Sequence, residues 1–374
     1  MKKRFFKVFI GFVATALFLA GCSGGKEAKN ESYVIGIALP LSGSSAEYGE
    51  ELKQGAELAV KLANDAGGIN GKKIEVIVKD DKSDPKEATA VASSFGNDKS
   101  VLGVVGHFNS SATLAAAPIY NKNQLVTVSP ASSSPNVTDA GDYIFRVITS
   151  DAFQAQYVSD WSVEEGFKTA AVIYDQTDFG TGLKDVYTAR AEENGLKIVN
   201  SESYVAGQTK DFTTILTKVK QNNPDVIFIG GLANDAATIV KQARNAGIQS
   251  TFIGVDSLYS PTLIELGGES AEGLLLPGFY DPNSERKATQ DFIAAYKKEY
   301  GKEPGAYAAY AFDAASVLIE AFKEGAKTRE EVKEKLYALK NFEGVTGVLS
   351  FDENGDVQTE PQKLIVKDGK FVAY

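Results

Sequence analysis

The sequence predicts an α/β protein made of two doubly wound lobes, and three observations support this fold class. Short apolar runs alternate with amphipathic stretches of helical period along most of the chain. This strand–helix pattern stops and restarts near residue 149. After residue 278, two helical stretches follow each other without a strand between them, and two strand-like runs end the chain. The order of these elements implies about three crossings between the lobes, which together form a hinge.

The first lobe begins with a predicted strand over Tyr33–Leu39 and a helix over Tyr48–Ala66, whose apolar residues recur at helical spacing. The turn GGINGKK then leads to a strand over Ile74–Asp80. A helix (DPKEATAVASSF), a strand (VLGVVG), a helix after NSSAT and a strand (LVTVSP) complete this half. Repeated β-α-β-α order is typical of a parallel sheet covered by helices.

The second lobe repeats the pattern. A strand over Thr169–Asp175 precedes a helix from about residue 182 to 194 and the strand LKIVNSESY. Phe212–Gly231 supplies a helix, a turn and a strand, and the helix AATIVKQARNAG precedes the strand STFIGVDS. We expect the two helices after residue 278 to pack on the first lobe, and VLSFDENGDV and KLIVKDGKF to close the second. The expected lobes are residues 33–148 with 278–345, and residues 149–277 with 346–374.

The N-terminus has the composition of a secretory signal. Four positive charges precede an apolar run from Val8 to Ala20, which is shorter than the roughly 20 residues that a membrane span needs. The run ends in LAGC, which resembles the lipobox of bacterial lipoproteins, in which the cysteine is acylated. We expect a signal peptide over 1–21, lipidation at Cys22 and a flexible tether over 22–32. The alternative is that Cys22 is a free reactive thiol.

Composition excludes several functions. Removal of the signal changes the formal net charge from −10 to −14, and no basic stripe is present, so we expect no nucleic-acid partner. The single cysteine rules out an internal disulfide, and no later segment is long and apolar enough to span a membrane. About 350 residues are enough for two ordinary domains.

Enzyme signatures are missing as well. The single histidine, His107, cannot form a two-histidine metal site, and no GxSxG, GxGxxG or GxxxxGK[ST] motif is present. We expect His107 to end a strand and make a local hydrogen bond. An oxygen-ligated metal at DENGD (Asp352–Asp356) is conceivable, but a turn between strands is the favoured interpretation. We therefore expect a binding protein with no catalytic residue, metal or cofactor.

Two groups of serines follow neighbouring predicted strands. Ser110 and Ser111 follow VLGVVG, and Ser132 to Ser134 follow LVTVSP. Ligands of parallel α/β sheets bind at the carboxyl ends of strands, where unpaired N–H groups of a helix start attract anions. Ser111, Ser132 and Ser134 are interpreted as caps or turn residues. For Ser110 and Ser133, a cap and a carboxylate-binding hydroxyl are equally good interpretations from the residues alone.

A family resemblance favours binding. The opening IGIALPLSGSSAEYGEELKQGAELAVKLANDAGGINGKKIEVIVKDDKSDPKEA resembles that of the leucine/isoleucine/valine-binding proteins, the amino-acid receptors of ABC importers. GHFNSSAT, SPASSSPNVT, GQTKDFTTIL, QARNAGI, GESAEGLL and PGAYAAYAFDA also resemble that family, in order over the whole mature chain. The resemblance implies a type I periplasmic binding protein, with two Rossmann-like lobes joined by three crossovers (a Venus flytrap).

The resemblance also implies site residues. Ser110 and Ser133 match hydroxyls that hold the ligand α-carboxylate, while the carbonyl of Ala131 and the carboxylate of Asp256 match the groups that hold the α-ammonium. A helix cap is the alternative role for Asp256. The residues that match the walls of the side-chain pocket, with core packing as their alternative, are Tyr48, Phe179, Leu232 and Tyr307.

This sequence departs from the family in three ways. Family members often carry a disulfide between the positions that are Ser83 and Asn109 here. This chain lacks both cysteines, so no disulfide makes these two loops rigid. Phe179 and Leu232 replace tyrosines of the best-known members, which makes the pocket more apolar. Asp256 replaces a longer glutamate, which moves the ammonium anchor by one methylene group.

These expectations describe a monomeric receptor on the outer face of the cell membrane, anchored through Cys22. It closes on an L-amino acid, with a branched aliphatic side chain as the first choice, and delivers it to the transmembrane subunits of an ABC permease. One alternative is a receptor of the same fold for an amide, urea-like or aromatic carboxylate ligand. Another is a ligand sensor for a signalling partner.

Overall fold

The computed structural model describes residues 32–374. The expected signal peptide, the lipidation site at Cys22 and nearly all of the tether lie outside these residues. None of the helices in the described part of the chain is long and apolar enough to span a membrane.

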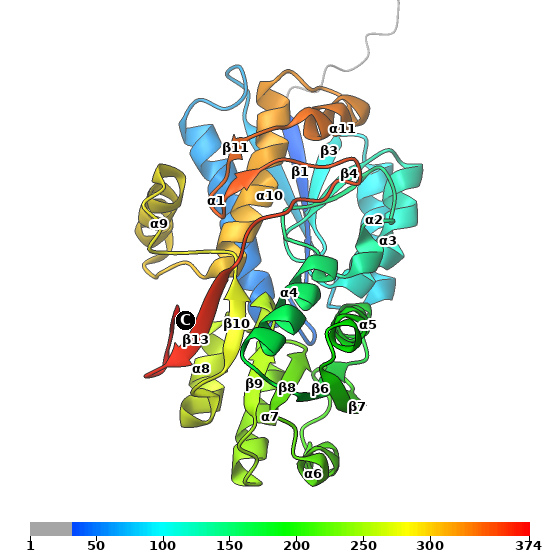
Figure 1. The fold of residues 1–374 in the computed structure, drawn as a ribbon. Helices are drawn as coiled ribbons and strands as arrows, with labels where there is room; N and C mark the ends of the chain where they lie inside the picture. The colour runs from blue at the N-terminus through cyan, green and yellow to red at the C-terminus, as the bar shows by residue number, and fades with distance from the viewer. Residues whose placement is uncertain (1–31) are drawn as a thin grey trace, which may run out of the picture. The chain divides into compact units, whose positions relative to one another are not determined.

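The first sheet is parallel and has five strands in the order β2-β1-β3-β4-β5. Its strands β1, β3 and β4 lie side by side in Figure 1. The strands are β1 (Tyr33–Leu39), β2 (Ile74–Asp80), β3 (Val101–Gly106), β4 (Val126–Ser129) and β5 (Ile144–Arg146). Alternate residues of β1 enter two different cores: Ile35 and Ile37 pack in one, and Val34 and Ala38 in the other. Helices therefore cover both faces, as the apolar runs predict for a parallel sheet.

The helices of this lobe come from two parts of the chain. From the first part come α1 (Ala46–Asp65), α2 (Pro85–Asn97), α3 (Ser110–Lys122) and the short 3-10 helix η1 (Pro135–Val137). From the second part come α9 (Lys287–Tyr300), α10 (Ala306–Lys323) and α11 (Arg329–Ala338). Residues of α1, α9 and α10 share one core with the first sheet, as expected, and so do residues of α11, a helix that was not predicted. Helices α2 and α3 pack on the other face of the sheet.

The second sheet has seven strands in the order β14-β13-β10-β9-β8-β6-β7. Its strands are β6 (Thr169–Asp175), β7 (Lys197–Tyr204), β8 (Val226–Gly230), β9 (Thr251–Gly254), β10 (Leu275–Gly278), β13 (Gln362–Lys367) and β14 (Lys370–Ala373). The last two strands pair antiparallel, and the others are parallel. Its helical segments are α4 (Asp151–Glu164), α5 (Asp178–Glu193), α6 (Thr213–Asn222), α7 (Ala233–Asn245), α8 (Pro261–Gly267), and the 3-10 helices η2 (Asp256–Leu258) and η3 (Gly268–Ala271).

The chain passes from the first sheet to the second after β5, returns after β10, and passes again before β13. The first and third passages lie side by side, because Thr149 and Val357 form a parallel bridge. The hydroxyl groups of Thr149 and Thr359 also hydrogen-bond over 3.0 Å. The predicted fold class, two α/β lobes with chiefly parallel sheets, is confirmed.

Some expected elements differ. The strand expected in VLSFDENGDV does not join the second sheet: β12 (Val348–Leu349) pairs with β11 (Phe342–Glu343), because Leu349 and Phe351 are buried in the core of the first lobe. Our proposed lobes therefore keep residues up to about Val357 with the first lobe. Helix α5 begins four residues before the expected start, because the Thr177 side chain caps it at Gly180 N–H.

Candidate ligand-binding site

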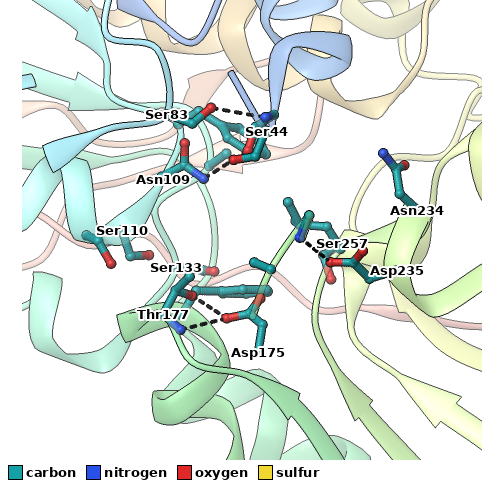
Figure 2. A pocket seen from close by; sticks show the side chains of 18 of the residues that line it. Ser44, Ser83, Asn109, Ser110, Ser133, Asp175, Thr177, Asn234, Asp235 and Ser257 are labelled. Atoms are coloured by element: carbon teal, nitrogen blue, oxygen red, sulfur yellow. Dashed lines mark hydrogen bonds between the residues drawn. The ribbon is translucent and has the colours of Figure 1, made fainter. Parts of the chain in front are cut away.

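A cavity of about 350 Å³ lies between the two lobes, at the carboxyl ends of strands from both sheets (Figure 2). Loops that follow β3 and β4 line it from the first lobe, and loops that follow β6, β8 and β9 line it from the second. Open parallel sheets bind their ligands at this edge. The volume lies in the range of about 300–1,000 Å³ that is usual for small-molecule sites.

Most of the predicted site residues lie together. The seven that line the cavity are Ser110, Ala131, Ser133, Phe179, Leu232, Asp256 and Tyr307. Tyr48 lies behind this lining and is only 3 % exposed. Its ring stacks on Phe108 at a centroid distance of 5.1 Å and meets the edge of Tyr307 at 5.0 Å. Tyr48 therefore supports the aromatic wall instead of forming its surface.

Ser110 and Ser133 lie on loops that are joined by a hydrogen bond. Ser110 is the first residue of α3, and its Oγ accepts from the N–H of Ser134 over 3.2 Å. No side-chain hydrogen bond from Asn109 caps this helix. The helix start therefore offers both a hydroxyl and the positive end of the helix dipole to an anion. Ser110 appears on the opposite side of the cavity from Asn234 and Asp235 in Figure 2.

The other serines have different partners. Ser132 braces the first lobe, as expected of a turn residue: its Oγ is 3.0 Å from the carbonyl oxygen of His107 and 2.6 Å from the hydroxyl of Thr113. Ser134 precedes the 3-10 helix η1 at its N-cap position, as expected of a cap or turn residue, but its side chain does not cap that helix, and Ser111 lies inside the first turn of α3. Their hydroxyls instead hydrogen-bond to Asp178 of the second lobe, over 2.6 and 3.0 Å.

Asp256 is the acidic residue on the second-lobe side. It is 8 % exposed, and burial raises its pKa to about 6. Its N–H donates to Gln154 Oε1 over 3.4 Å. Asp256 does not cap α8, because the Ser260 side chain caps that helix at Thr262 N–H. The cap interpretation of Asp256 is therefore wrong, and Asp256 lines the cavity.

Asp151 is a residue that the sequence analysis missed. It is the first residue of α4, it is fully buried, and its N–H donates to the carbonyl oxygen of Ser133 over 2.7 Å. Burial and the neighbouring Asp256 carboxylate raise the pKa of Asp151 well above its usual range, while the Ser133 hydroxyl lowers it. The first turn of α4 thus touches both ends of the site, with Asp151 at Ser133 and Gln154 at Asp256.

Arg146 holds the loop that carries Ser133 and Ser134, and it is a second residue that the sequence analysis missed. Its guanidinium is fully buried, donates to the carbonyl oxygen of Ser134 over 2.9 Å, and pairs with Asp356 over 2.6 Å. This pair gives DENGD a structural role. Within residues 32–374, no three His, Cys, Asp or Glu side chains are grouped closely enough to hold a metal ion.

His107 has the local role that we expected. Its ring is fully buried, with Nδ1 2.7 Å from Asp81 Oδ2 and Nε2 3.0 Å from Tyr120 Oη. The ring therefore connects the end of β3 to α3 and to the loop after β2.

The cavity has an apolar side and a polar side. The apolar side includes Phe108 and Ile148, which the sequence analysis did not single out, beside Phe179, Leu232 and Tyr307. On the polar side, Asp175 accepts from Thr177 N–H over 2.9 Å, and Asp235 accepts from Gly207 N–H over 2.9 Å. Burial raises the pKa of both carboxyl groups. Both residues order loops at the cavity. The sequence analysis missed them because the partner of Asp235 is a distant backbone group and the partner of Asp175 is a nearby turn residue.

Two α/β lobes with a cavity at the facing edges of their sheets define a binding protein that encloses a small ligand. The chain belongs to the periplasmic binding protein family, whose sequence model matches residues 32–364. This family consists of substrate-binding proteins of ABC transporters and not of enzymes.

Two proteins of similar sequence are named for binding amino acids. The chain is 36% identical over 327 residues to the Leu/Ile/Val-binding protein homolog 1 of Brucella abortus, covering 86% of this chain and 87% of that protein. It is 33% identical over 329 residues to a leucine-, isoleucine-, valine-, threonine- and alanine-binding protein of Pseudomonas aeruginosa, covering 87% of each chain.

Solved structures share the fold. The branched-chain amino acid transporter substrate-binding protein LivJ of Streptococcus pneumoniae, solved with isoleucine, has a TM-score of 0.85 and 33% identity, covering 91% of this chain and 98% of that one. A solute-binding protein of Rhodopseudomonas palustris, solved with 3,4-dihydroxybenzoic acid, has a TM-score of 0.82 and 25% identity, covering 91% and 95%.

Proposed function

We propose that this chain is the extracytoplasmic substrate-binding protein of an ABC importer and that it binds an L-amino acid with a branched aliphatic side chain. The observation that carries the proposal is the placement of Asp256 and the two serines in one cavity that also has an aromatic and aliphatic side. A carboxylate at one end and hydroxyls with a helix start at the other match the two charges of a zwitterion.

Each group has a role in this proposal. Ser110 and Ser133 hold the ligand carboxylate, and Asp256 and the Ala131 carbonyl hold its ammonium group. The side chain of the ligand lies against Phe179, Leu232, Tyr307 and Phe108, with Tyr48 behind them. Burial of one branched side chain contributes about 1.5–3 kcal/mol. Charge-assisted hydrogen bonds supply the rest of a micromolar affinity, roughly −8 kcal/mol.

Attachment and delivery are also part of the proposal. The signal-like N-terminus and LAGC support a lipid anchor on Cys22, and the family supports an ABC permease as the partner of a monomeric receptor. Incorporation of a radiolabelled fatty acid tests the anchor. The wild-type chain is expected to be labelled and Cys22→Ser is expected not to be labelled; an unlabelled wild-type chain would overturn it.

A thermal-shift screen against all L-amino acids tests the ligand class. A ligand at about 100 times its dissociation constant adds about 2.7 kcal/mol to the free energy of unfolding, which raises Tm by a few degrees. A shift confined to leucine, isoleucine and valine is expected. A flat response from folded, ligand-free protein would contradict the proposal.

An aromatic carboxylate is the second candidate, because a similar structure holds 3,4-dihydroxybenzoic acid. Such a ligand has no ammonium group, so a neutral Asp256 suits it better than an ionised one. Competition separates the two candidates: excess L-leucine is expected to displace any aromatic acid that binds.

A further inference from the structure

Each proposed ligand-binding serine is followed directly by a serine that contacts the other lobe. Ser111 follows Ser110 at the start of α3, and Ser134 follows Ser133 after β4. The hydroxyls of Ser111 and Ser134 converge on one residue of the second lobe, Asp178. Two adjacent loops of the first lobe therefore meet the second lobe at a single point beside the cavity.

Asp178 uses both its side chain and its backbone in this contact. Ser111 Oγ donates to Asp178 Oδ2 over 2.6 Å and accepts from the N–H of Asp178 over 3.2 Å. Ser134 Oγ donates to the carbonyl oxygen of Asp178 over 3.0 Å. Asp178 is the first residue of α5, and the next residue, Phe179, lines the cavity. The contact thus ties the helix that carries part of the pocket wall to both serine loops.

Packing beside the contact is close enough to require glycine. Gly182 lies on the first turn of α5, and a Cβ atom at that position would be 2.8 Å from Pro135 Cδ and 3.3 Å from Ser134 Oγ. Real Cβ atoms do not approach other atoms within 3.0 Å. Glycine at position 182 therefore lets α5 lie close enough to Ser134 and Pro135 for the hydrogen bonds at Asp178 to form.

We infer that Asp178 is a positioning residue, which acts through Ser111 and Ser134 as an interlobe latch and couples ligand capture to lobe closure. This inference rests on the proposed function, because the latch serines share their loops with the proposed carboxylate-binding serines. A ligand carboxylate on Ser110 and Ser133 holds the same two loops that present Ser111 and Ser134 to Asp178. Because the Asp178 contact joins the two lobes, its formation shifts the equilibrium toward the closed arrangement and slows ligand release.

Ligand release measured by stopped flow on the full mature chain tests the latch. Asp178→Ala is expected to speed release roughly two- to tenfold, which corresponds to about 0.5–1.5 kcal/mol for the loss of one hydrogen bond of this kind. Asp178→Asn keeps an acceptor and is expected to restore most of the wild-type rate. Asp185→Ala is the matched control, because Asp185 lies on the same helix, is exposed, and pairs only with the adjacent Lys184 among the described residues.

A double-mutant cycle adds a readout that general destabilisation does not move. Asp178→Ala and Ser111→Ala remove the same hydrogen bond, so the double variant is expected to release ligand no faster than the faster single variant. Additive effects, or a release rate of Asp178→Ala equal to that of Asp185→Ala, would overturn the inference.

A distance measurement separates failure of the latch from failure of the proposed function. Spin labels on Lys86→Cys in α2 and Ala189→Cys in α5, both exposed positions, report the separation of the lobes when Cys22 is replaced by serine. Without ligand, Asp178→Ala is expected to lower the population at short distance relative to Asp185→Ala, and equal distributions would overturn the latch. If the wild type bound no branched-chain amino acid, the proposed function would fail while this comparison still tested the latch.

Discussion

Tyr310 and Asp256 face each other from opposite lobes, with the Tyr310 hydroxyl 3.5 Å from Asp256 Oδ2. Burial and the Asp256 carboxylate raise the pKa of Tyr310 well above its usual range, so the tyrosine is neutral. Among residues 32–374, no salt bridge involves Asp256. A buried carboxylate on a cavity wall that has no salt-bridge partner is the arrangement that a ligand ammonium group completes.

Removal of this carboxylate provides the first prediction. Asp256→Ala is expected to weaken L-leucine binding at least a hundredfold, because the ligand ammonium group is then desolvated without a counter-charge. Titration calorimetry measures the change. A loss smaller than tenfold would show that Asp256 does not hold the ammonium group.

The pH dependence of binding provides the second prediction. The pKa of Asp256 is raised to about 6 by burial, so the carboxylate that binds an ammonium group is lost as the pH falls below that value. Affinity for leucine is expected to be about tenfold lower at about pH 5 than at about pH 8, because about a tenth of Asp256 is then ionised. Calorimetry across this range measures it, and a constant affinity would contradict the assigned pKa or role.

The stability of the ligand-free protein provides the third prediction. It changes with pH in the direction opposite to the affinity for leucine. Because the folded-state pKa of Asp256 is raised, the folded protein binds more protons than the unfolded chain between about pH 4 and 6. The free energy of unfolding therefore falls as the pH rises through this window. Asp256→Asn is expected to raise it by about 1–3 kcal/mol at about pH 8 while weakening leucine binding. Urea unfolding at that pH measures the difference, and a less stable variant would refute the explanation.

Arg329 provides a prediction about stability away from the site. Arg329 is 9 % exposed, and within residues 32–374 its guanidinium donates only to backbone carbonyl groups. The acceptors belong to Phe95, Gly96, Asp98, Val101 and Asn123. Arg329→Ala leaves these carbonyls without their donor and is expected to lower the free energy of unfolding by about 3 kcal/mol. Arg190→Ala, at an exposed pair with Asp160, is the control and is expected to leave the free energy of unfolding nearly unchanged. Equal effects would contradict this role of Arg329.

Local pattern was enough to predict most of the fold. β-Branched runs such as Tyr33–Leu39 and Val101–Gly106 indicate buried parallel strands, and helical spacing indicates the covering helices. Short strands were harder to detect. β5 and β10 have three and four residues, and β10 contains Pro277, so neither gives a periodic signal. The pairing of β12 depends on burial of Leu349 in a core built from distant segments.

The site was predictable where residue type and position at a strand end carried the signal, as for the serines. Asp256 and the pocket walls came from the family resemblance, because their convergence depends on how two lobes meet. The supporting residues were not predictable in this way. Asp151, Arg146 and Asp178 lie in ordinary positions of the sequence, and their roles appear only through contacts with Ser133, Ser134 and Ser111.

The most direct test of the amino-acid assignment compares L-leucine with 4-methyl-2-oxopentanoate, its counterpart without the ammonium group, by titration calorimetry at about pH 8. Both ligands have the same carboxylate and the same branched side chain. We expect micromolar binding of leucine and binding of the oxo acid at least a hundredfold weaker, with Asp256→Ala removing most of the difference. Equal affinity of the wild-type protein for the two ligands would contradict this expectation, because the Asp256 carboxylate would then contribute nothing to recognition.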